Sequence, residues 1–327
     1  MGGIVKVVFH GANASTFYPG FAELLDDQHD LILLDDALTD PADQQAYENA
    51  DVIIGIKFNG DMPKPAKLKL YQVPGAGYDG IATAELSEDT HLCNCFGHEI
   101  AIAEYAMAAL LSRHVPLADA DQRLRKGDWK YWAGGPSGVR TELGDTTIGI
   151  LGYGHIGKEI ARRAKGFGMT VHAANRSEIN DPAVVDQCYA LRDFGKMLPH
   201  VDVVVNTLPL ATGTVGLIDA GAFAHMQAHA VFMNVGRGGV VDEDALYTAL
   251  KNNQIAHAFI DTWYIYPNAP TAVTQPSKHP FSDLANITMT PHMSGWTHGT
   301  IERRKKAMAN NINLIAQGQV PINLIAK

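Results

Sequence analysis

Cysteine is scarce in this chain of 327 residues, and its spacing fits neither a metal site nor a redox centre. The three cysteines are Cys93, Cys95 and Cys188. One residue separates the first two, which is neither the CxxC spacing of a dithiol centre nor a zinc-ligand spacing. We therefore expect buried thiols without a catalytic role, no bound metal, and a reducing location, the cytoplasm.

Long apolar runs and an excess of basic residues are also missing. No apolar run approaches the roughly 20 residues that a membrane-spanning helix needs. The formal net charge is -9, and the acidic residues are scattered rather than gathered in a block. Such a charge disfavours binding to nucleic acids or anionic membranes, so we expect neither as a partner. Residues 1–10 are predicted to form the first strand and not a signal peptide, because no basic region precedes a long apolar one.

The chain instead alternates short apolar strands with helical patterns, which is typical of βαβ units and a parallel sheet. An Ala-rich segment without glycine or proline, residues 99–111, is predicted to be a long helix. An irregular connection follows at 127–144. The strands are expected in two series: 4–9, 31–34, 50–55 and 69–73, and then 146–151, 170–174, 201–206, 231–235, 257–261 and 287–290.

Two complete series predict an α/β fold with two doubly wound parallel-sheet domains. A Rossmann-type dinucleotide-binding domain, residues 98–292, is expected to be inserted in a flavodoxin-like substrate domain. The substrate domain is then formed by residues 1–97 together with 293–327. Crevices between domains of this kind are common sites for small molecules.

A glycine-rich turn carries the strongest functional signal. Gly152-Tyr153-Gly154-His155-Ile156-Gly157 follows an apolar strand directly and opens a helical segment, which is the context that gives a GxGxxG motif its meaning. Gly152 permits the tight turn, Gly154 lets backbone approach a pyrophosphate, and Gly157 lets the helix pack closely on its strand. The amides of His155 and Ile156 are then expected to point at phosphate oxygens.

The residues that follow the second strand of this domain predict the preferred cofactor. An NAD site usually has Asp or Glu there, whereas this chain has Asn175, Arg176 and Ser177. Asparagine removes the repulsion between a carboxylate and a 2′-phosphate, and arginine pairs with phosphate through a fork of N–H donors. We therefore expect NADP(H) to be preferred, with NAD(H) as the alternative.

Several later motifs point the same way. They are Leu208-Pro209-Leu210 through Thr214-Val215-Gly216-Leu217-Ile218, the run Asn234-Val235-Gly236-Arg237-Gly238-Gly239-Val240-Val241-Asp242, and Pro291-His292. Together with the glycine turn they closely resemble the D-isomer-specific 2-hydroxyacid dehydrogenase family, most strongly from about residue 146 to 294. That family includes D-lactate, glyoxylate/hydroxypyruvate, phosphoglycerate, phosphite and formate dehydrogenases. The resemblance implies hydride transfer between NAD(P)(H) and a small 2-keto or 2-hydroxy carboxylate.

The resemblance also assigns roles to individual residues. Arg237 matches the arginine that orients the carboxylate, a role suited to bidentate pairing. His292 matches the acid/base histidine, which suits a proton transfer near neutral pH. In the outer domain the loop Gly75, Ala76 and Gly77 matches the substrate loop, whose amides hold the carboxylate. The residues implied to line the cofactor groove are Leu208, Pro209, Thr214, Val235, Gly236, Arg237, Asp261 and His292.

His98 stands before the long helix, where many members carry asparagine. It is either a contact to substrate or nicotinamide, or a solvent-exposed residue at the start of a helix. The resemblance further implies a homodimer, with Trp129 and Trp132 in the connection that helps the contact.

One position departs from the family. Most members have a glutamate five residues after the aspartate, which hydrogen-bonds the catalytic histidine and raises its pKa. Here Tyr266 follows Asp261 at that spacing. Either Tyr266 hydrogen-bonds His292 and leaves its pKa nearer the ordinary value of about 6.5, or Trp263, Tyr264 and Tyr266 pack as an aromatic wall.

Two other functions remain open at this point. The missing glutamate favours a formate- or phosphite-type dehydrogenase, because formate dehydrogenases also lack it. A dinucleotide-sensing regulatory protein without turnover is the third candidate, since the family's corepressors keep the site. The sequence names neither the acid nor the physiological direction of the reaction.

Overall fold

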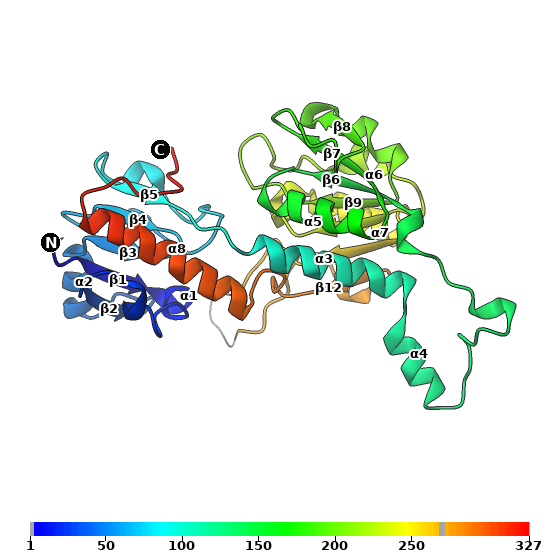
Figure 1. Ribbon diagram of the computed structural model, residues 1–327, viewed down its shortest axis with the longest axis horizontal. Coiled ribbons are helices and arrows are strands. Elements are labelled where there is room, and N and C mark those ends of the chain that lie inside the picture. Colours follow the sequence, from blue (N-terminus) through cyan, green and yellow to red (C-terminus); the bar gives the residue numbers. More distant parts are fainter. Residues whose placement is uncertain (1–2, 268–271, 327) are drawn as a thin grey trace. The chain divides into compact units, whose positions relative to one another are not determined.

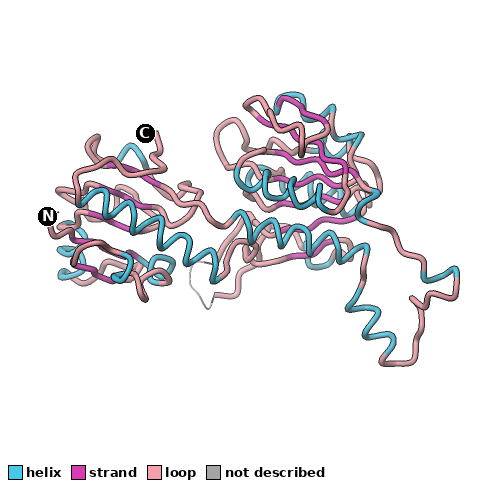
Figure 2. Tube along the Cα trace, in the orientation of Figure 1, coloured by secondary structure: helices cyan, strands magenta, loops and turns pink. Residues whose placement is uncertain are grey.

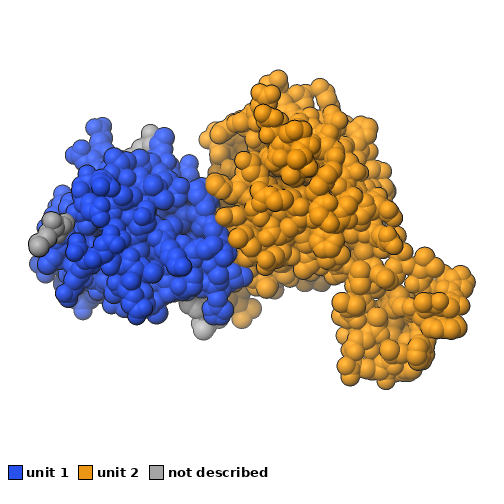
Figure 3. Space-filling model, viewed as in Figure 1, with its two compact units in different colours: residues 1–97, 297–327 blue, residues 98–296 orange. Residues whose placement is uncertain are grey.

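The computed structural model describes residues 3–267 and 272–326, which fall into two compact units (Figures 1 and 3). Unit 1 comprises residues 1–97 and 297–327, and unit 2 comprises 98–296. The chain thus returns to unit 1 after Trp296, whereas the sequence placed this boundary after His292. Both divisions put His292 in the unit that carries the glycine turn.

Unit 1 is built on a five-stranded parallel sheet with the order β2-β1-β3-β4-β5. Helix α8 (His298–Ala316) packs on one face through Met308 and Ile312, which join the apolar cluster of β1 and β3. The other face packs against Tyr47 of α2 (Pro41–Glu48). The remaining elements are β1 (Lys6–His10), α1 (Gly11–Ser15), β2 (Asp30–Leu34), β3 (Val52–Ile54), β4 (Leu70–Gln72) and β5 (His91–Cys93).

Unit 2 is built on a seven-stranded parallel sheet with the order β12-β11-β10-β9-β6-β7-β8. Figure 2 shows the strands in magenta and the helices around them in cyan. The order reverses between β6 and β9, and ligands of open α/β sheets bind at the carboxyl ends of the strands beside such a switch point. The strands are β6 (Thr147–Leu151), β7 (Thr170–Asn175), β8 (Gln187–Ala190), β9 (Val203–Asn206), β10 (Val231–Asn234), β11 (His257–Ile260) and β12 (Ile287–Met289).

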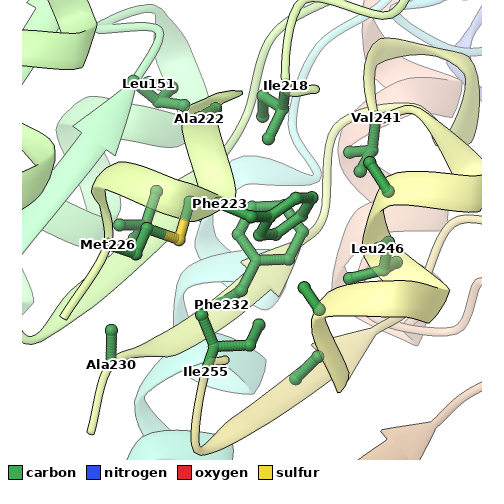
Figure 4. Packing of buried hydrophobic residues seen from close by; sticks show 14 of the residues in the cluster. Leu151, Ile218, Ala222, Phe223, Met226, Ala230, Phe232, Val241, Leu246 and Ile255 are labelled. Carbon is green, nitrogen blue, oxygen red and sulfur yellow. The ribbon is translucent and has the colours of Figure 1, made fainter. Parts of the chain in front are cut away.

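Helices cover both faces of this sheet. On one face, α3 (Glu99–His114) and α5 (His155–Gly166) bury residues such as Ile102 and Ile160. On the other face, α6 (Ala220–His225) and α7 (Glu243–Lys251) cover a second cluster (Figure 4). There Phe223 meets Phe232 edge to face with ring centroids 5.4 Å apart. The predicted fold class, two doubly wound parallel-sheet domains, is confirmed.

Two strands of the structure were not predicted, β5 and β8. Each lies at the edge of its sheet, is short, and contains too few apolar residues to stand out as a run. Strand β8 pairs with β7 alone and is largely exposed, so no apolar pattern is needed there. In residues 3–267 and 272–326, no helix is both long enough and apolar enough to cross a membrane.

A projecting segment of unit 2 follows α3. Helix α4 (Leu117–Leu124) and the connection to β6 extend away from the sheet of this unit (Figure 1). The segment presents large apolar side chains to solvent: Leu117, Leu124, Trp129, Trp132 and Val139 are each at least half exposed. We call residues 115–142 the arm.

Candidate active site

The three glycines of the turn after β6 differ in their backbone conformation and in the space around them. Gly152 adopts φ +95°, and a Cβ atom on it would lie 2.9 Å from Thr207 Oγ1. A Cβ on Gly157 would lie 2.1 Å from the carbonyl oxygen of Gly152, so α5 approaches the turn as closely as backbone allows. Nothing lies within 4 Å of the Cβ position of Gly154. The turn therefore has open space at Gly154, next to the first residues of α5.

Asn175, at the end of β7, faces this turn. Its Oδ1 accepts a hydrogen bond from the amide of Tyr153 (3.1 Å), and its Nδ2 donates to the carbonyl of Ser177 (3.1 Å). Arg176 and Ser177 are exposed next to it. Within the described residues, no hydrogen bond or ion pair engages the guanidinium of Arg176. Asn175 thus stabilises the turn through its two hydrogen bonds, and the side chain of Arg176 faces solvent.

Two asparagines that sequence reasoning missed shape the neighbouring loops. Asn206 and Asn234 end β9 and β10, are fully buried, and are joined by a bond from Asn206 Nδ2 to Asn234 Oδ1 (2.9 Å). Asn206 Oδ1 accepts from the amide of Leu208, and Asn234 binds both the amide of Gly236 and the carbonyl of Arg237. The sequence did contain a signal for these two asparagines. Each of the two adjacent strands is otherwise apolar and ends in an asparagine.

The predicted groove residues lie on these loops. Leu208 and Val235 are buried with only 4% and 3% of their surface exposed. Thr214 turns inward, because its hydroxyl donates to the carbonyl of Pro209 (2.7 Å) and accepts from the amide of Ala211. Pro209 itself is exposed.

Arg237 follows β10 in a loop that only glycines permit. A Cβ on Gly236 would lie 2.6 Å from the carbonyl oxygen of Leu208, and one on Gly238 would lie 2.2 Å from that of Trp263. The guanidinium is half-buried and donates from Nη1 to the carbonyl of Gly236 (2.9 Å). Its positive charge reaches Tyr266, whose pKa it lowers in opposition to the stronger, raising effect of burial.

Tyr266 and His292 are hydrogen-bonded partners. Tyr266 Oη lies 3.0 Å from His292 Nδ1 and accepts a hydrogen bond from the amide of Trp263 (3.0 Å). Trp263 is buried, and its Nε1 donates to the carbonyl of Thr290 (2.8 Å). The hydrogen-bonded arrangement, one of the two expected from sequence, is therefore present. Burial raises the pKa of Tyr266, so its hydroxyl stays neutral around neutral pH.

Asp261 lies directly after β11 with none of its surface exposed. Its carboxylate accepts three hydrogen bonds, from Thr290 Oγ1 (2.6 Å), the amide of Met293 (2.9 Å) and the amide of Ser294 (3.0 Å). These donors flank His292, which has a left-handed backbone with φ +57°. Asp261, Arg237, Tyr266 and His292 thus belong to one group of loops at the carboxyl ends of β10, β11 and β12.

The loop Gly75–Gly77 of unit 1 follows β4. Its carbonyls are used internally: Gly75 accepts from the amide of Cys95 (2.9 Å), and Ala76 accepts from Asn94 Nδ2 (2.9 Å). In the described part of the chain, the amides of Ala76 and Gly77 have no hydrogen-bond partner. These two neighbouring amides are donors available to an anion, and the carboxylate role predicted for this loop stays a prediction.

His98 begins α3 and is buried, with 8% of its surface exposed. The solvent-exposed alternative considered for it is therefore wrong. Its Nδ1 lies 3.8 Å from Glu99 Oε2, and Gly295 packs against its Cβ.

Comparison with known proteins agrees with this geometry. Residues 106–294 match the family described as D-isomer specific 2-hydroxyacid dehydrogenase, NAD binding domain. The chain belongs to this family. Within it, the chain is 30% identical to a glyoxylate reductase of Thermococcus litoralis over 89% of this chain and 82% of that one. It is 32% identical to glyoxylate/hydroxypyruvate reductase B of Salmonella paratyphi B over 68% and 67% of the two chains.

Solved structures extend the likeness to the whole fold. A 2-hydroxyacid dehydrogenase family protein from Aeromonas salmonicida subsp. salmonicida superposes with a TM-score of 0.79 and 27% identity, covering 98% of both chains. The protein is therefore an NAD(P)-dependent oxidoreductase of the 2-hydroxyacid dehydrogenase family, related to glyoxylate reductases.

Proposed function

We propose that the protein is an NADPH-preferring reductase of small 2-keto acids, in which Arg237 orients the carboxylate and His292 exchanges the proton. The observation that carries this proposal is the grouping of three side chains within unit 2. Tyr266 is hydrogen-bonded to His292 and lies within the field of Arg237. A guanidinium and an imidazole close together fit an anionic substrate whose carbonyl oxygen gains or loses a proton.

The glycine turn fits a nicotinamide dinucleotide. The open space at Gly154 and the first amides of α5, those of His155 and Ile156, would hold the pyrophosphate. When bound, the reduced cofactor supplies the hydride to the carbonyl carbon of the substrate. The remaining work, which is binding, orientation and proton transfer, falls to side chains of the chain itself.

We assign the proton transfer to one of the two imidazole nitrogens of His292. Nδ1 of His292 is engaged by Tyr266, so Nε2 is the nitrogen that gives its proton to the substrate oxygen during reduction. That step needs the imidazolium, and the reverse oxidation needs the neutral imidazole. Arg237 is always charged and binds the carboxylate in either direction.

The preference for NADP(H) rests on Arg176. Its guanidinium is exposed beside the turn, and the neighbouring Asn175 carries no charge that would repel a 2′-phosphate. A planar fork of donors matches a phosphate group. NAD(H) remains the alternative cofactor.

Further parts of the proposal concern the rest of the chain. The unpaired amides of Ala76 and Gly77 support the role of their loop as a substrate-binding element of unit 1. The exposed aromatic residues of the arm support a homodimer. Three free cysteines, two of them buried, are compatible with the cytoplasmic location inferred from composition.

Turnover of a panel of acids tests the proposal. Glyoxylate, hydroxypyruvate, pyruvate and phenylpyruvate are offered with NADPH or NADH at equal, low concentration, and the absorbance of the reduced nicotinamide is followed. We expect turnover of at least one 2-keto acid and a clear preference for NADPH. His292→Ala should lower the rate by ~10²–10⁴-fold, whereas the exposed control His200→Ala should not.

The other outcomes assign other functions. Turnover of formate or phosphite in place of all four acids would identify the second candidate function. Tight cofactor binding without turnover of any acid would identify the regulatory one. Preference for NADH would overturn the role of Arg176.

A further inference from the structure

The loop that joins β7 to β8, residues 176–186, carries Arg176 and has little packing of its own. Val185 alone among residues 176–186 is buried, and Ile179 packs only partly against the apolar cluster that α5 covers. A loop exposed to this degree keeps one conformation only where specific bonds hold it. The position of the Arg176 guanidinium therefore depends on the hydrogen bonds that reach this loop.

Tyr153, the second residue of the glycine turn, bonds to both ends of the stretch that carries Arg176. Its amide donates to Asn175 Oδ1 (3.1 Å), and its hydroxyl donates to Asp181 Oδ2 (2.7 Å). Asn175 in turn donates from Nδ2 to the carbonyl of Ser177 (3.1 Å). One residue of the turn thus fixes the chain immediately before Arg176 and again at Asp181.

The bond between Tyr153 and Asp181 is shielded from water on the tyrosine side. Tyr153 has 5% of its surface exposed, and burial, followed by the neighbouring carboxylate, raises the pKa of its hydroxyl. The hydroxyl therefore stays a donor across the neutral range, and a charged acceptor makes such a bond roughly twice as strong as a neutral one. The carbonyl of Asp181 also accepts from the amides of Val184 (3.1 Å) and Val185 (2.9 Å), which fixes its own position.

The same bond occupies a negative charge that would otherwise compete for Arg176. Two carboxylates follow this arginine closely in the chain. Glu178 is exposed, and Asp181 is bonded to Tyr153. Neither forms an ion pair with Arg176, whose guanidinium has no partner among the described residues and is available to an anion. A released Asp181 carboxylate would pair with the guanidinium and repel a phosphate group.

We propose that Tyr153 and Asp181 form a clamp, which holds the loop of Arg176 in the shape that receives a 2′-phosphate and so sets the selectivity for NADP(H) over NAD(H). Both are positioning residues, because they act on the cofactor through the guanidinium. This inference rests on the proposed function, which assigns Arg176 to the 2′-phosphate. It goes beyond that function by tracing the selectivity to a hydroxyl on the glycine turn and a carboxylate on the loop.

Preorganisation makes the clamp act on one cofactor more than on the other. NAD(H) has a hydroxyl group where NADP(H) has the 2′-phosphate, so its binding does not call on Arg176. A loop that is already ordered loses less conformational entropy when it takes up the phosphate, which strengthens binding. The open space at Gly154 serves the pyrophosphate, which both cofactors share. Loss of the clamp should therefore weaken NADP(H) and leave NAD(H) almost unchanged.

Tyr153→Phe tests the clamp, because phenylalanine fills the same space and lacks only the hydroxyl. Calorimetry measures the Kd of NADP⁺ and of NAD⁺ for the variant and the wild type. We expect the Kd of NADP⁺ to rise roughly tenfold, the equivalent of one hydrogen bond to a charged group. The Kd of NAD⁺ should stay within about twofold of wild type. The control Tyr189→Phe, on β8, removes a hydroxyl that forms no hydrogen bond among the described residues and should change neither Kd.

Two variants at position 181 separate the bond from the charge. Asp181→Ala removes both, whereas Asp181→Asn keeps an oxygen that accepts from the tyrosine hydroxyl. We express selectivity as the Kd of NAD⁺ divided by the Kd of NADP⁺. It should stay close to wild type in Asp181→Asn and fall in Asp181→Ala, but less than in Tyr153→Phe, which leaves the carboxylate free. The double variant Tyr153→Phe, Asp181→Ala should therefore match Asp181→Ala, and a double variant in which the two losses add would overturn the clamp.

Hydrogen exchange separates this inference from the proposed function. Without cofactor or acid, the amides of residues 176–181 should exchange faster in Tyr153→Phe than in the wild type. If the wild type binds NAD⁺ more tightly than NADP⁺, the proposed cofactor preference fails. The clamp still requires faster exchange and a lower selectivity in Tyr153→Phe. Unchanged exchange, unchanged selectivity, or equal weakening of both cofactors in that variant would overturn the clamp.

Discussion

At the scale of single residues, the proton chemistry proposed for His292 would depend on a neutral group, Tyr266, at the position where the resemblance implies a glutamate. The hydroxyl of Tyr266 accepts from Trp263 N and meets His292 Nδ1, and burial raises its pKa. A neutral hydroxyl satisfies the imidazole but adds no negative charge beside it. We therefore expect the imidazolium, which the proposed reduction requires, to be less favoured than it would be with glutamate at position 266.

Tyr266→Glu should reverse this difference. A carboxylate beside Nδ1 raises the pKa of the histidine, and reduction proceeds below that pKa and is lost as pH rises through it. The alkaline limb of kcat/KM for reduction should therefore move to higher pH. Tyr266→Phe, which adds no charge, should keep the limb near its wild-type position. A limb that does not move in Tyr266→Glu would contradict the assignment of His292 as the titrating acid.

Residues also differ in how far sequence could place them. Arg237, His292 and the three glycines of the turn stand in motifs whose spacing already implies their neighbours. The inward direction of Asp261 was beyond reach, because its partners lie some thirty positions along the chain and depend on the backbone of His292. Pattern reasoning gives the type of a residue at a strand end, whereas the direction of its side chain depends on packing.

At the scale of elements, the start of α5 has glycine at two positions for two different reasons, which are close packing and room for a ligand. Gly157 has no room for a side chain, because the carbonyl of Gly152 lies 2.1 Å from its Cβ position. Gly154 has room, with nothing within 4 Å and an ordinary negative φ. The first position serves the packing of helix on strand, and the second serves the ligand.

Two alanine variants separate these requirements. Gly157→Ala forces α5 off its strand, and we expect it to lower the free energy of unfolding by about 1–3 kcal/mol. Gly154→Ala should leave that free energy nearly unchanged and weaken NADP⁺ binding at least tenfold, because the methyl group occupies the space open to pyrophosphate. Chemical denaturation and calorimetry measure the two effects. Equal stability of both variants would contradict the close approach of α5.

The strands of unit 2 also differ in how well sequence patterns predict them. The central strands of unit 2 are buried on both faces and read as unbroken apolar runs, such as 203–205 and 231–233. All of them were predicted. The edge strand β8 is largely exposed and pairs with β7, so little pattern is required of it, and the buried edge strand β5 is only three residues long. Burial, more than strand propensity, makes an element visible in a sequence.

At the scale of the whole molecule, the arm is the segment that supports the prediction of a homodimer. Trp129 is 65% exposed and Trp132 is 61% exposed. Helix α4 (Leu117–Leu124), in the same arm, contains no buried residue. Apolar groups gathered on a projecting segment mark an interaction surface. Because tryptophans contribute strongly to interface energies, a second copy of the chain is the partner we expect.

Sedimentation or light scattering decides the oligomeric state. We expect the wild type to show twice the mass of one chain at the concentrations of a turnover assay. The double variant Trp129→Ser, Trp132→Ser should weaken the dimer by more than tenfold in Kd, since each buried tryptophan contributes on the order of 2 kcal/mol or more at an interface. The control Val320→Ser removes an apolar group that is 63% exposed in unit 1 and should leave the dimer intact. A wild type that sediments as a monomer, or a double variant that dimerises as tightly as the control, would show that the arm serves another contact. Because the arm residues lie outside the loops that hold Arg237 and His292, a monomeric variant that keeps its kcat would further place the proton chemistry within a single copy of unit 2.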